Sequence, residues 1–382
     1  MVLQSVGMDS LQGCSRISLN TVGVRLRKRS VRLFGSLTLL LGTLPLAAQK
    51  SSTFNFVVSG DSRNCGDIVM PAIAEGAKKD DAQFYWHLGD FRAIFAVDED
   101  IANRANGARP ASLGEYQRTA WQDAISNQLE IFGEMPVYAG IGNHETIPPK
   151  TRAEFVETFS KWLDAPALHS QREQDSADST VKTYYHWRQQ GVDFIYLDNA
   201  SEVEFDPGQV TWFEKVLASD KQDASVKAVV VGMHAALPNS LAAGHSMNNW
   251  RAGEASGTRV YTDLIDFRNQ SRKNVYVLAS HSHFYMRGIF DSDYWKSHGG
   301  VLPGWIVGTA GAHRYKLPED AHKAEEAKTN VYGYLLATAH DDGKIDFKFK
   351  EIKEGNIPSD VKQRFGSSLV HECFAGNSDV RR

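Results

Sequence analysis

Five short apolar runs along the chain each lead into a small group of polar residues. The runs are Phe54–Ser59, Phe84–Leu88, Pro136–Ile141, Val226–Met233 and Val275–Ser280. Apolar runs of this length predict strands that are buried on both faces of a mostly parallel sheet. We therefore expect the polar residues that follow to gather at the carboxyl edge of one sheet, which is where open α/β folds bind ligands.

Amphipathic segments between these runs predict helices that cover the sheet. Apolar residues recur at helical spacing in 67–79, 112–132, 153–163, 209–218 and 259–272. Ser112 and Glu115 form a capping-box signature at the start of the second segment. Alternation in 181–187 and 192–197 predicts a hairpin around Gly191, whereas 165–180 is polar and predicts a surface connection.

Two further stretches predict a second sheet packed on the first. They are Trp305–Gly308 and 332–352, the latter broken at Asp341-Asp342-Gly343. The fold class is then α/β, a four-layer αββα sandwich of two mixed sheets flanked by helices. Segment 235–257 lacks hydrophobic periodicity, and is either a plain surface loop or a lip over the ligand site.

The polar residues that follow the five predicted strands are typical of a transition-metal site. The first two read Gly60-Asp61-Ser62-Arg63 and Gly89-Asp90-Phe91-Arg92, the third reads Gly142-Asn143-His144-Glu145, and the last two are His234 and His281-Ser282-His283. Carboxylates, an amide oxygen and imidazoles together favour zinc, iron or manganese over calcium or magnesium, because imidazole is a ligand for softer ions. A single Asn-His pair would indicate no more than a turn. The prediction depends on all five groups.

In this order the five motifs resemble the calcineurin-like metallophosphoesterases, a family that includes purple acid phosphatases and many nucleases and nucleotidases. The resemblance covers residues 54–307, and Gly142-Asn143-His144-Glu145 is its most specific block. It implies the αββα fold and a dinuclear centre at the carboxyl ends of the strands, with two divalent or trivalent ions of manganese, iron or zinc.

The implied ligands are Asp61, Asp90 and His283 for the first ion, and Asp90, Asn143, His234 and His281 for the second. Asp90 would be the bridge. His144 matches the family's histidine that binds no metal and faces the phosphate, and Glu145 matches its orienting partner.

Two positions depart from the family pattern. The first motif usually reads Asp-x-His, but Arg63 stands at its third position, so one ligand of the first ion is absent. Purple acid phosphatases also lack that histidine and use a tyrosine three residues after the bridging aspartate, where this chain has Ala93. An arginine stays protonated and cannot ligate a metal ion. We therefore expect Arg63 either to bind the substrate phosphate or to pair with a nearby acid. The last motif begins with Ser280 in place of glycine.

These residues together predict hydrolysis of phosphate esters. Two neighbouring cations bind phosphate oxygens and lower the pKa of water, so that it attacks phosphorus at neutral pH. His144, near the leaving oxygen, could donate the proton that the leaving group needs. A diesterase or nucleotidase would share these motifs. The other alternative is a degenerate member that binds a phosphate-bearing ligand without turnover, but the presence of His144 favours an enzyme.

The first residues have the order of a secretory signal peptide. The basic run Arg25–Arg32 precedes an apolar stretch, Leu33–Leu46, and the small residues Ala47-Ala48. We expect residues 1–48 to be removed on export to the periplasm or the extracellular space, leaving 49–382 as a single metallophosphoesterase domain with a C-terminal tail. The apolar stretch is short for a stable membrane span. An uncleaved anchoring helix is the alternative.

Charge and cysteine content narrow the choice of partners. Without residues 1–48 the net charge falls from −4 to about −9, which argues against a dedicated nucleic-acid binder and favours a small phosphorylated substrate. Cys65 and Cys373 remain, and in an oxidising compartment they could form a disulfide or stay as two separate thiols. The sequence does not determine the oligomeric state.

Overall fold

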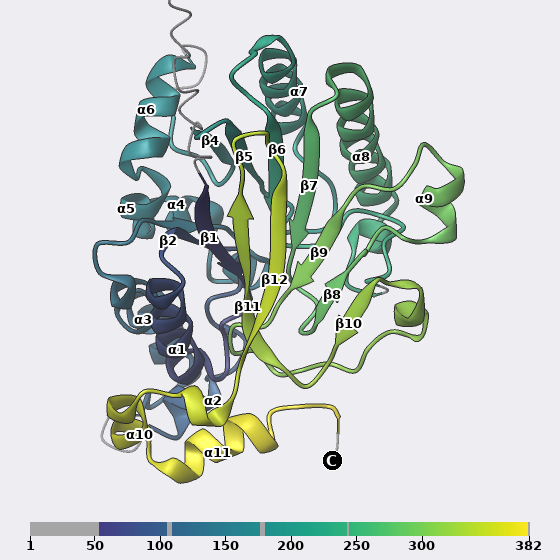
Figure 1. Ribbon diagram of the computed structural model, residues 1–382. Coiled ribbons are helices and arrows are strands. Elements are labelled where there is room, and N and C mark those ends of the chain that lie inside the picture. The colour runs from purple at the N-terminus through teal and green to yellow at the C-terminus, as the bar shows by residue number, and fades with distance from the viewer. Residues whose placement is uncertain (1–52, 105–108, 176–179, 243, 381–382) are drawn as a thin grey trace, which may run out of the picture. The chain divides into compact units, whose positions relative to one another are not determined.

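Two mixed β-sheets lie face to face in the computed structural model, which describes residues 53–104, 109–175, 180–242 and 244–380 (Figure 1). The five-stranded sheet has the order β12-β11-β1-β2-β3, and the seven-stranded sheet has the order β10-β8-β9-β7-β6-β5-β4. Helices flank the pair of sheets. The predicted α/β fold of two mixed sheets between helices is therefore confirmed.

The first three apolar runs form neighbouring parallel strands of the five-stranded sheet. They are β1 (Phe54–Ser59), β2 (Ala82–His87) and β3 (Val137–Ala139). A hairpin of β11 (Tyr332–Ala339) and β12 (Ile345–Ile352) extends the sheet beside β1 in antiparallel fashion.

The other two apolar runs belong to the seven-stranded sheet. They form β6 (Ala228–Met233) and β7 (Asn274–Ala279), which are parallel neighbours. The rest of this sheet consists of β4 (Tyr185–Gln189), β5 (Val192–Leu197), β8 (Tyr285–Arg287), β9 (Gly304–Val307) and β10 (Glu326–Lys328). The prediction that all five runs share one sheet is therefore wrong. So is the grouping of 305–308 with 332–352, since β9 and the β11–β12 hairpin lie in different sheets.

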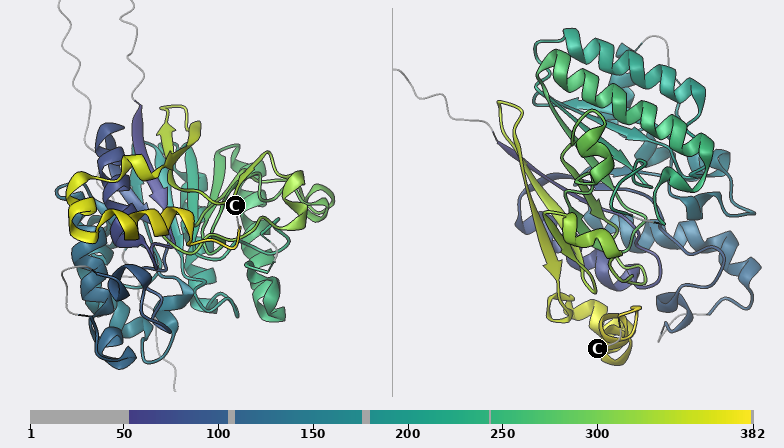
Figure 2. Two further views of the ribbon diagram at one scale, coloured as in Figure 1. Left: turned by 90° about the horizontal axis from the view of Figure 1, so that it is seen from below. Right: turned by 90° about the vertical axis from the view of Figure 1, so that its right-hand side faces the viewer.

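Alternation along β5 shows how the layers are held together. Ile195 and Leu197 pack on one face with residues of α7 (Pro207–Gln222) and α8 (Arg251–Ser271). Phe194 and Tyr196 point the other way, into the core between the sheets. Figure 2 shows α7 and α8 on the outer face of the seven-stranded sheet, while α1 (Gly66–Lys79) covers the five-stranded one.

Several helices agree with the sequence prediction and others do not. Ser112 caps α3 (Leu113–Ala124) by accepting a 3.2 Å bond from the Glu115 N–H, and the helix continues as a π-helical turn, η1 (Ile125–Leu129), and a 3-10 turn, η2 (Glu130–Phe132). The predicted helix at 153–163 is divided into α4 (Arg152–Thr158) and α5 (Ser160–Leu163). Short helices that were not predicted are α2 (Glu99–Ala102), α9 (Asp293–Ser297), η3 (Asn143–Thr146), η4 (Met247–Asn249), η5 (Glu319–Lys323) and η6 (Glu354–Asn356).

Two predicted loops were assigned incorrectly. Segment 165–180 contains α6 (Pro166–Gln174), whose buried residues are Leu168 and Gln171 alone, so too few apolar positions face the core to give a helical period. Segment 235–257 ends in the first two turns of α8, where Gly253 and Gly257 are buried. Glycines on a buried helical face carry no hydrophobic signal.

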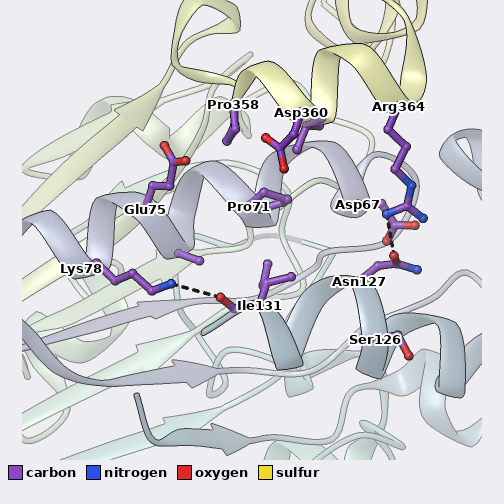
Figure 3. A pocket seen from close by; sticks show the side chains of 12 residues that line it. Asp67, Pro71, Glu75, Lys78, Ser126, Asn127, Ile131, Pro358, Asp360 and Arg364 are labelled. Carbon is purple, nitrogen blue, oxygen red and sulfur yellow. Dashed lines mark hydrogen bonds between the residues drawn. The ribbon is translucent and has the colours of Figure 1, made fainter. Parts of the chain in front are cut away.

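The C-terminal tail forms α10 (Ser359–Phe365) and α11 (Ser367–Ala375) and is bonded to the core. Cys65 and Cys373 form a disulfide, with Cα atoms 6.0 Å apart. Between α1, η1 and α10 lies a pocket of about 280 Å³ (Figure 3), where the Arg364 guanidinium donates to Asn127 Oδ1 at 2.8 Å. That contact helps to fix the tail on the helices beneath it.

In the part of the chain that the structure describes, no helix is both long and apolar enough to cross a bilayer. The predicted signal peptide, residues 1–48, lies outside the described residues.

Candidate metal centre

Loops from both sheets bring the predicted ligands together at one point. Ligand atoms of Asp61, Asp90 and His283 lie within 4.8 Å of one another, and so do those of Asp90, His234 and His281. Asp90 belongs to both groups. Asn143 Oδ1 lies 2.9 Å from His234 Nε2, which places Asn143 beside the second group.

The backbone at these positions is constrained. Asp61, Asp90 and His281 have left-handed φ values of 60°, 64° and 63°, which few residues other than glycine adopt. Gly142 is required for a different reason, since a Cβ there would lie 2.2 Å from Asp90 Oδ1. Such conformations persist only where the surrounding contacts enforce them, and they cluster at functional sites.

Glu145 holds the loops of β2 and β3 together. Its buried carboxylate accepts N–H bonds from Asp90 at 2.8 Å, Phe91 at 3.0 Å and Gly142 at 2.8 Å. Burial and the charge of Asp90 raise the pKa of Glu145 to about 8, against the effect of these bonds. The sequence resemblance made Glu145 the partner of the His144 ring, but the described contacts of its carboxylate are with the backbone.

The His144 ring is oriented by the backbone after β2. Its Nδ1 donates to the Ala93 carbonyl at 2.6 Å, and its Nε2 lies 3.6 Å from Asp90 Oδ2. Burial lowers the pKa of His144, and the charge of Asp90 opposes that effect. The ring therefore presents Nε2 to the centre in a fixed orientation.

Three other histidines are oriented by oxygen atoms outside the centre. His234 Nδ1 is 3.0 Å from the Leu88 carbonyl, and His283 Nδ1 is 2.6 Å from the His313 carbonyl. His281 Nε2 is 3.2 Å from Glu202 Oε1. In each ring the other nitrogen faces the carboxylates or the neighbouring histidine, which is how metal-ligating histidines are usually held.

The charges of the centre also suit metal ions. Asp61 Oδ1 and Asp90 Oδ2 are buried and have no hydrogen-bond partner, an arrangement that is costly unless a cation is bound. Burial disfavours ionisation, but neighbouring histidines hold the pKa of Asp61 below its usual value and that of Asp90 well below it. Despite burial, the two acids raise the pKa of His234 to about 10. The two carboxylates thus favour a proton on the His234 ring, and a cation bound at that ring nitrogen would displace the proton.

Arg63 points into the first group of residues. Its guanidinium donates to Tyr315 Oη at 3.2 Å, lies 3.4 Å from His283 Nε2 and approaches Asp90 Oδ2 at 4.0 Å. Both expectations for Arg63 therefore stay open, because its guanidinium is near an acid and also lies among the candidate metal ligands. The side-chain amide of the next residue, Asn64, does not join this group, since it contacts Glu99 and the backbone N–H of His313.

Sequence reasoning missed several residues of the centre. Tyr315 stacks on His283 with ring centroids 4.0 Å apart, and it follows β9 in an irregular segment without a recognisable motif. Asn199 Oδ1 accepts the backbone N–H of His234 at 3.1 Å. A signal for Asn199 did exist, because β5 also leads directly into a polar pair, Asp198-Asn199. His245 belongs to segment 235–257, for which a lip over the site was one of the two expectations, and its ring centroid lies 5.1 Å from that of His281.

The C-terminal segment contacts residues that orient the ligands of this centre. The His313 carbonyl that orients His283 belongs to a residue whose ring contacts Asn377 Oδ1 at 3.0 Å and Asp379 Oδ1 at 2.8 Å. The disulfide joins α11 to Cys65, two residues after Arg63. Truncation of the tail would therefore disturb the first group.

Comparisons with known proteins show the fold. No protein-family model and no curated protein sequence matches the chain. The structure of the purple acid phosphatase PPD1 from yellow lupin (Lupinus luteus) seeds is similar, with a TM-score of 0.51 and 16% identity over 79% of this chain and 52% of that one. The chain thus spans about half the length of the lupin phosphatase.

Two further solved structures show weaker similarity. The PhoD structure gives a TM-score of 0.47 and 15% identity over 84% of this chain and 77% of that one. A phosphatase from Mycoplasma pneumoniae gives 0.34 and 11% over 79% and 94%. At this level of identity, the lupin phosphatase indicates a shared fold and does not assign a family.

Proposed function

We propose that the chain is an exported, metal-dependent phosphoesterase that hydrolyses phosphate esters of small molecules. The observation that carries this proposal is the pair of residue groups that share Asp90, in which two buried carboxylate oxygens accept no hydrogen bond. Asp61, Asp90 and His283 would hold one ion, and Asp90, Asn143, His234 and His281 the other. Two such ions, when bound, supply the charge that lowers the pKa of water and offsets the charge of the phosphoryl group.

The remaining chemistry falls to His144 and Arg63. We assign His144 the role of general acid, with Nε2 donating a proton to the leaving oxygen. The Ala93 carbonyl fixes Nδ1 and leaves Nε2 facing the centre. A phosphate group beside Nε2 would favour the protonated ring. The Arg63 guanidinium, already inside the centre, would bind the phosphate oxygens.

A substrate screen on protein of known metal content tests the proposal. A monoester, a diester and a nucleotide are compared, and Asp90→Asn serves as the inactive control. Turnover that disappears in the control supports a phosphoesterase, and the preferred ester separates a monoesterase from a diesterase or nucleotidase. Phosphate binding without turnover of any ester by the metal-loaded wild type would refute the enzyme and leave a ligand-binding protein.

Arg63→Ala should raise KM for phosphate esters about 10- to 100-fold, the usual value of a hydrogen bond to a charged group, with little change in metal content. Arg63→His should instead increase the occupancy of the first metal site, because it supplies the ligand that the motif lacks. Arg63→Lys, which keeps the charge but not the planar fork, is the matched control. If Arg63→Ala left both KM and kcat unchanged, the arginine would be structural.

Export is part of the same proposal. It rests on the charge and apolar order of residues 1–48, and the Cys65–Cys373 disulfide supports it because disulfides persist in oxidising compartments. We expect natively made protein to begin near Gln49. N-terminal sequencing that recovered the basic run Arg25–Arg32 would contradict this.

A further inference from the structure

Phe95 is an exposed aromatic residue beside the metal centre. The residue is 56% exposed, although burial of a phenylalanine side chain stabilises a protein. Its ring centroid lies 5.4 Å from that of His144 and 5.9 Å from the Arg63 guanidinium carbon. The ring is therefore next to both residues that we assign to the substrate.

The backbone that carries Phe95 is held in a strained conformation. Ile94 is buried and has a φ of 63°, which is an outlier for a β-branched residue and persists only where the surrounding structure enforces it. The Ala93 carbonyl closes the turn by accepting the Phe95 N–H at 2.7 Å. The turn brings the Phe95 ring to the surface while Ile94 stays in the core.

Buried polar groups enforce this turn. The carboxylate of Asp98 accepts the Ala93 N–H at 3.1 Å and is hydrogen-bonded by the Tyr116 hydroxyl. Gln117 Nε2 donates to the Ile94 carbonyl at 3.0 Å. The conformation is thus fixed from two sides, and the exposed ring is not the result of a loosely packed loop.

One turn positions both the acid and the ring. The Ala93 carbonyl that closes the turn also accepts the bond from His144 Nδ1. A leaving group that takes its proton from His144 Nε2 must lie beside that imidazole, and Phe95 is the exposed apolar surface there. An aromatic ring in that position could pack on Phe95 at the 4.5–7 Å spacing of aromatic pairs.

We propose that Phe95 determines specificity by packing against an aromatic ring in the leaving alcohol, so that the preferred substrates are phosphate esters of aromatic alcohols. This inference rests on the proposed function and adds the substrate class to it. Arg63 would hold the phosphate, His144 would protonate the ester oxygen, and Phe95 would bind the departing ring. An alkyl leaving group would gain little from Phe95.

Phenyl phosphate and glycerol 2-phosphate separate the two kinds of leaving group. Phe95→Ala should lower kcat/KM for phenyl phosphate about 3- to 10-fold, the worth of one aromatic pair, and change that for glycerol 2-phosphate by under about twofold. Phe95→Tyr should restore the preference. Tyr294→Ala is the matched control. Tyr294 is 37% exposed and lies on α9, which carries no residue of the centre. Its ring stacks on that of His298, with centroids 4.1 Å apart.

Binding of phenylphosphonate and methylphosphonate to the metal-loaded proteins, measured by calorimetry, provides a readout without turnover. Phe95→Ala should weaken phenylphosphonate by the same factor and leave methylphosphonate unchanged. Equal effects on both phosphonates, or no effect on either, would overturn the inference. Failure of the proposed function has a different signature, because wild type would then hydrolyse neither ester while the phosphonate comparison still decides the role of Phe95.

Discussion

Removing the metal ions should abolish ester hydrolysis, and adding back manganese, zinc or iron should restore it. The expected loss is essentially complete, because the bound ions would both lower the pKa of the attacking water and offset the charge of the phosphoryl group. Without cations, Asp61 and Asp90 each keep a buried carboxylate oxygen that accepts no hydrogen bond. The metal-free protein should therefore also unfold at a lower temperature, since a ligand that binds only the native state stabilises it.

The measurement is activity and thermal unfolding after chelation, dialysis and readdition of each ion, with metal content determined at every stage. Protein carried through the same dialysis without a chelator is the control. Full activity in protein shown to be free of metal would contradict the assignment of all six ligands, whatever the fold. Restored stability without restored activity would place the ions in a structural role.

The apolar pattern of the sequence was sufficient to locate the strands and the candidate site residues that follow them, because the polar residues that flank a buried strand must lie outside the core. It could not assign strands to sheets. A run such as that of β6 is apolar on both faces in either sheet, and the pattern carries no information about which neighbour it pairs with. The six proposed ligands are nevertheless close together, since both sheets direct their loops to the same point.

Residues that act on the ligands were harder to find. Tyr315 and Glu202 reach the centre from irregular segments, and no periodicity or motif marks them. Asn199 could have been included by applying the strand rule to β5 as well. The sequence comparison noted Ala93 only because it lacks a tyrosine side chain, whereas its carbonyl orients His144. A backbone contact of this kind depends on the turn at Ile94.

His144→Ala should keep the bound metal ions but lower turnover about 10²- to 10⁴-fold, the usual contribution of general acid catalysis. The ring is oriented for this task by a single 2.6 Å bond to the Ala93 carbonyl, and it contributes no atom to either of the two carboxylate and histidine groups. Metal content should therefore equal that of the wild type. His298→Ala, which removes an exposed histidine on a different part of the chain, should leave turnover unchanged.

The dependence on leaving group distinguishes an acid from a phosphate-binding residue. Aryl phosphates that differ in ring substituents keep an aromatic group beside Phe95 but vary in how much the departing oxygen needs a proton. For His144→Ala the loss should be large for phenyl phosphate and should shrink for nitrophenyl phosphate, because nitrophenolate leaves without protonation. Equal losses across the series would assign His144 to binding the phosphate, and the leaving group would then have to be protonated by solvent.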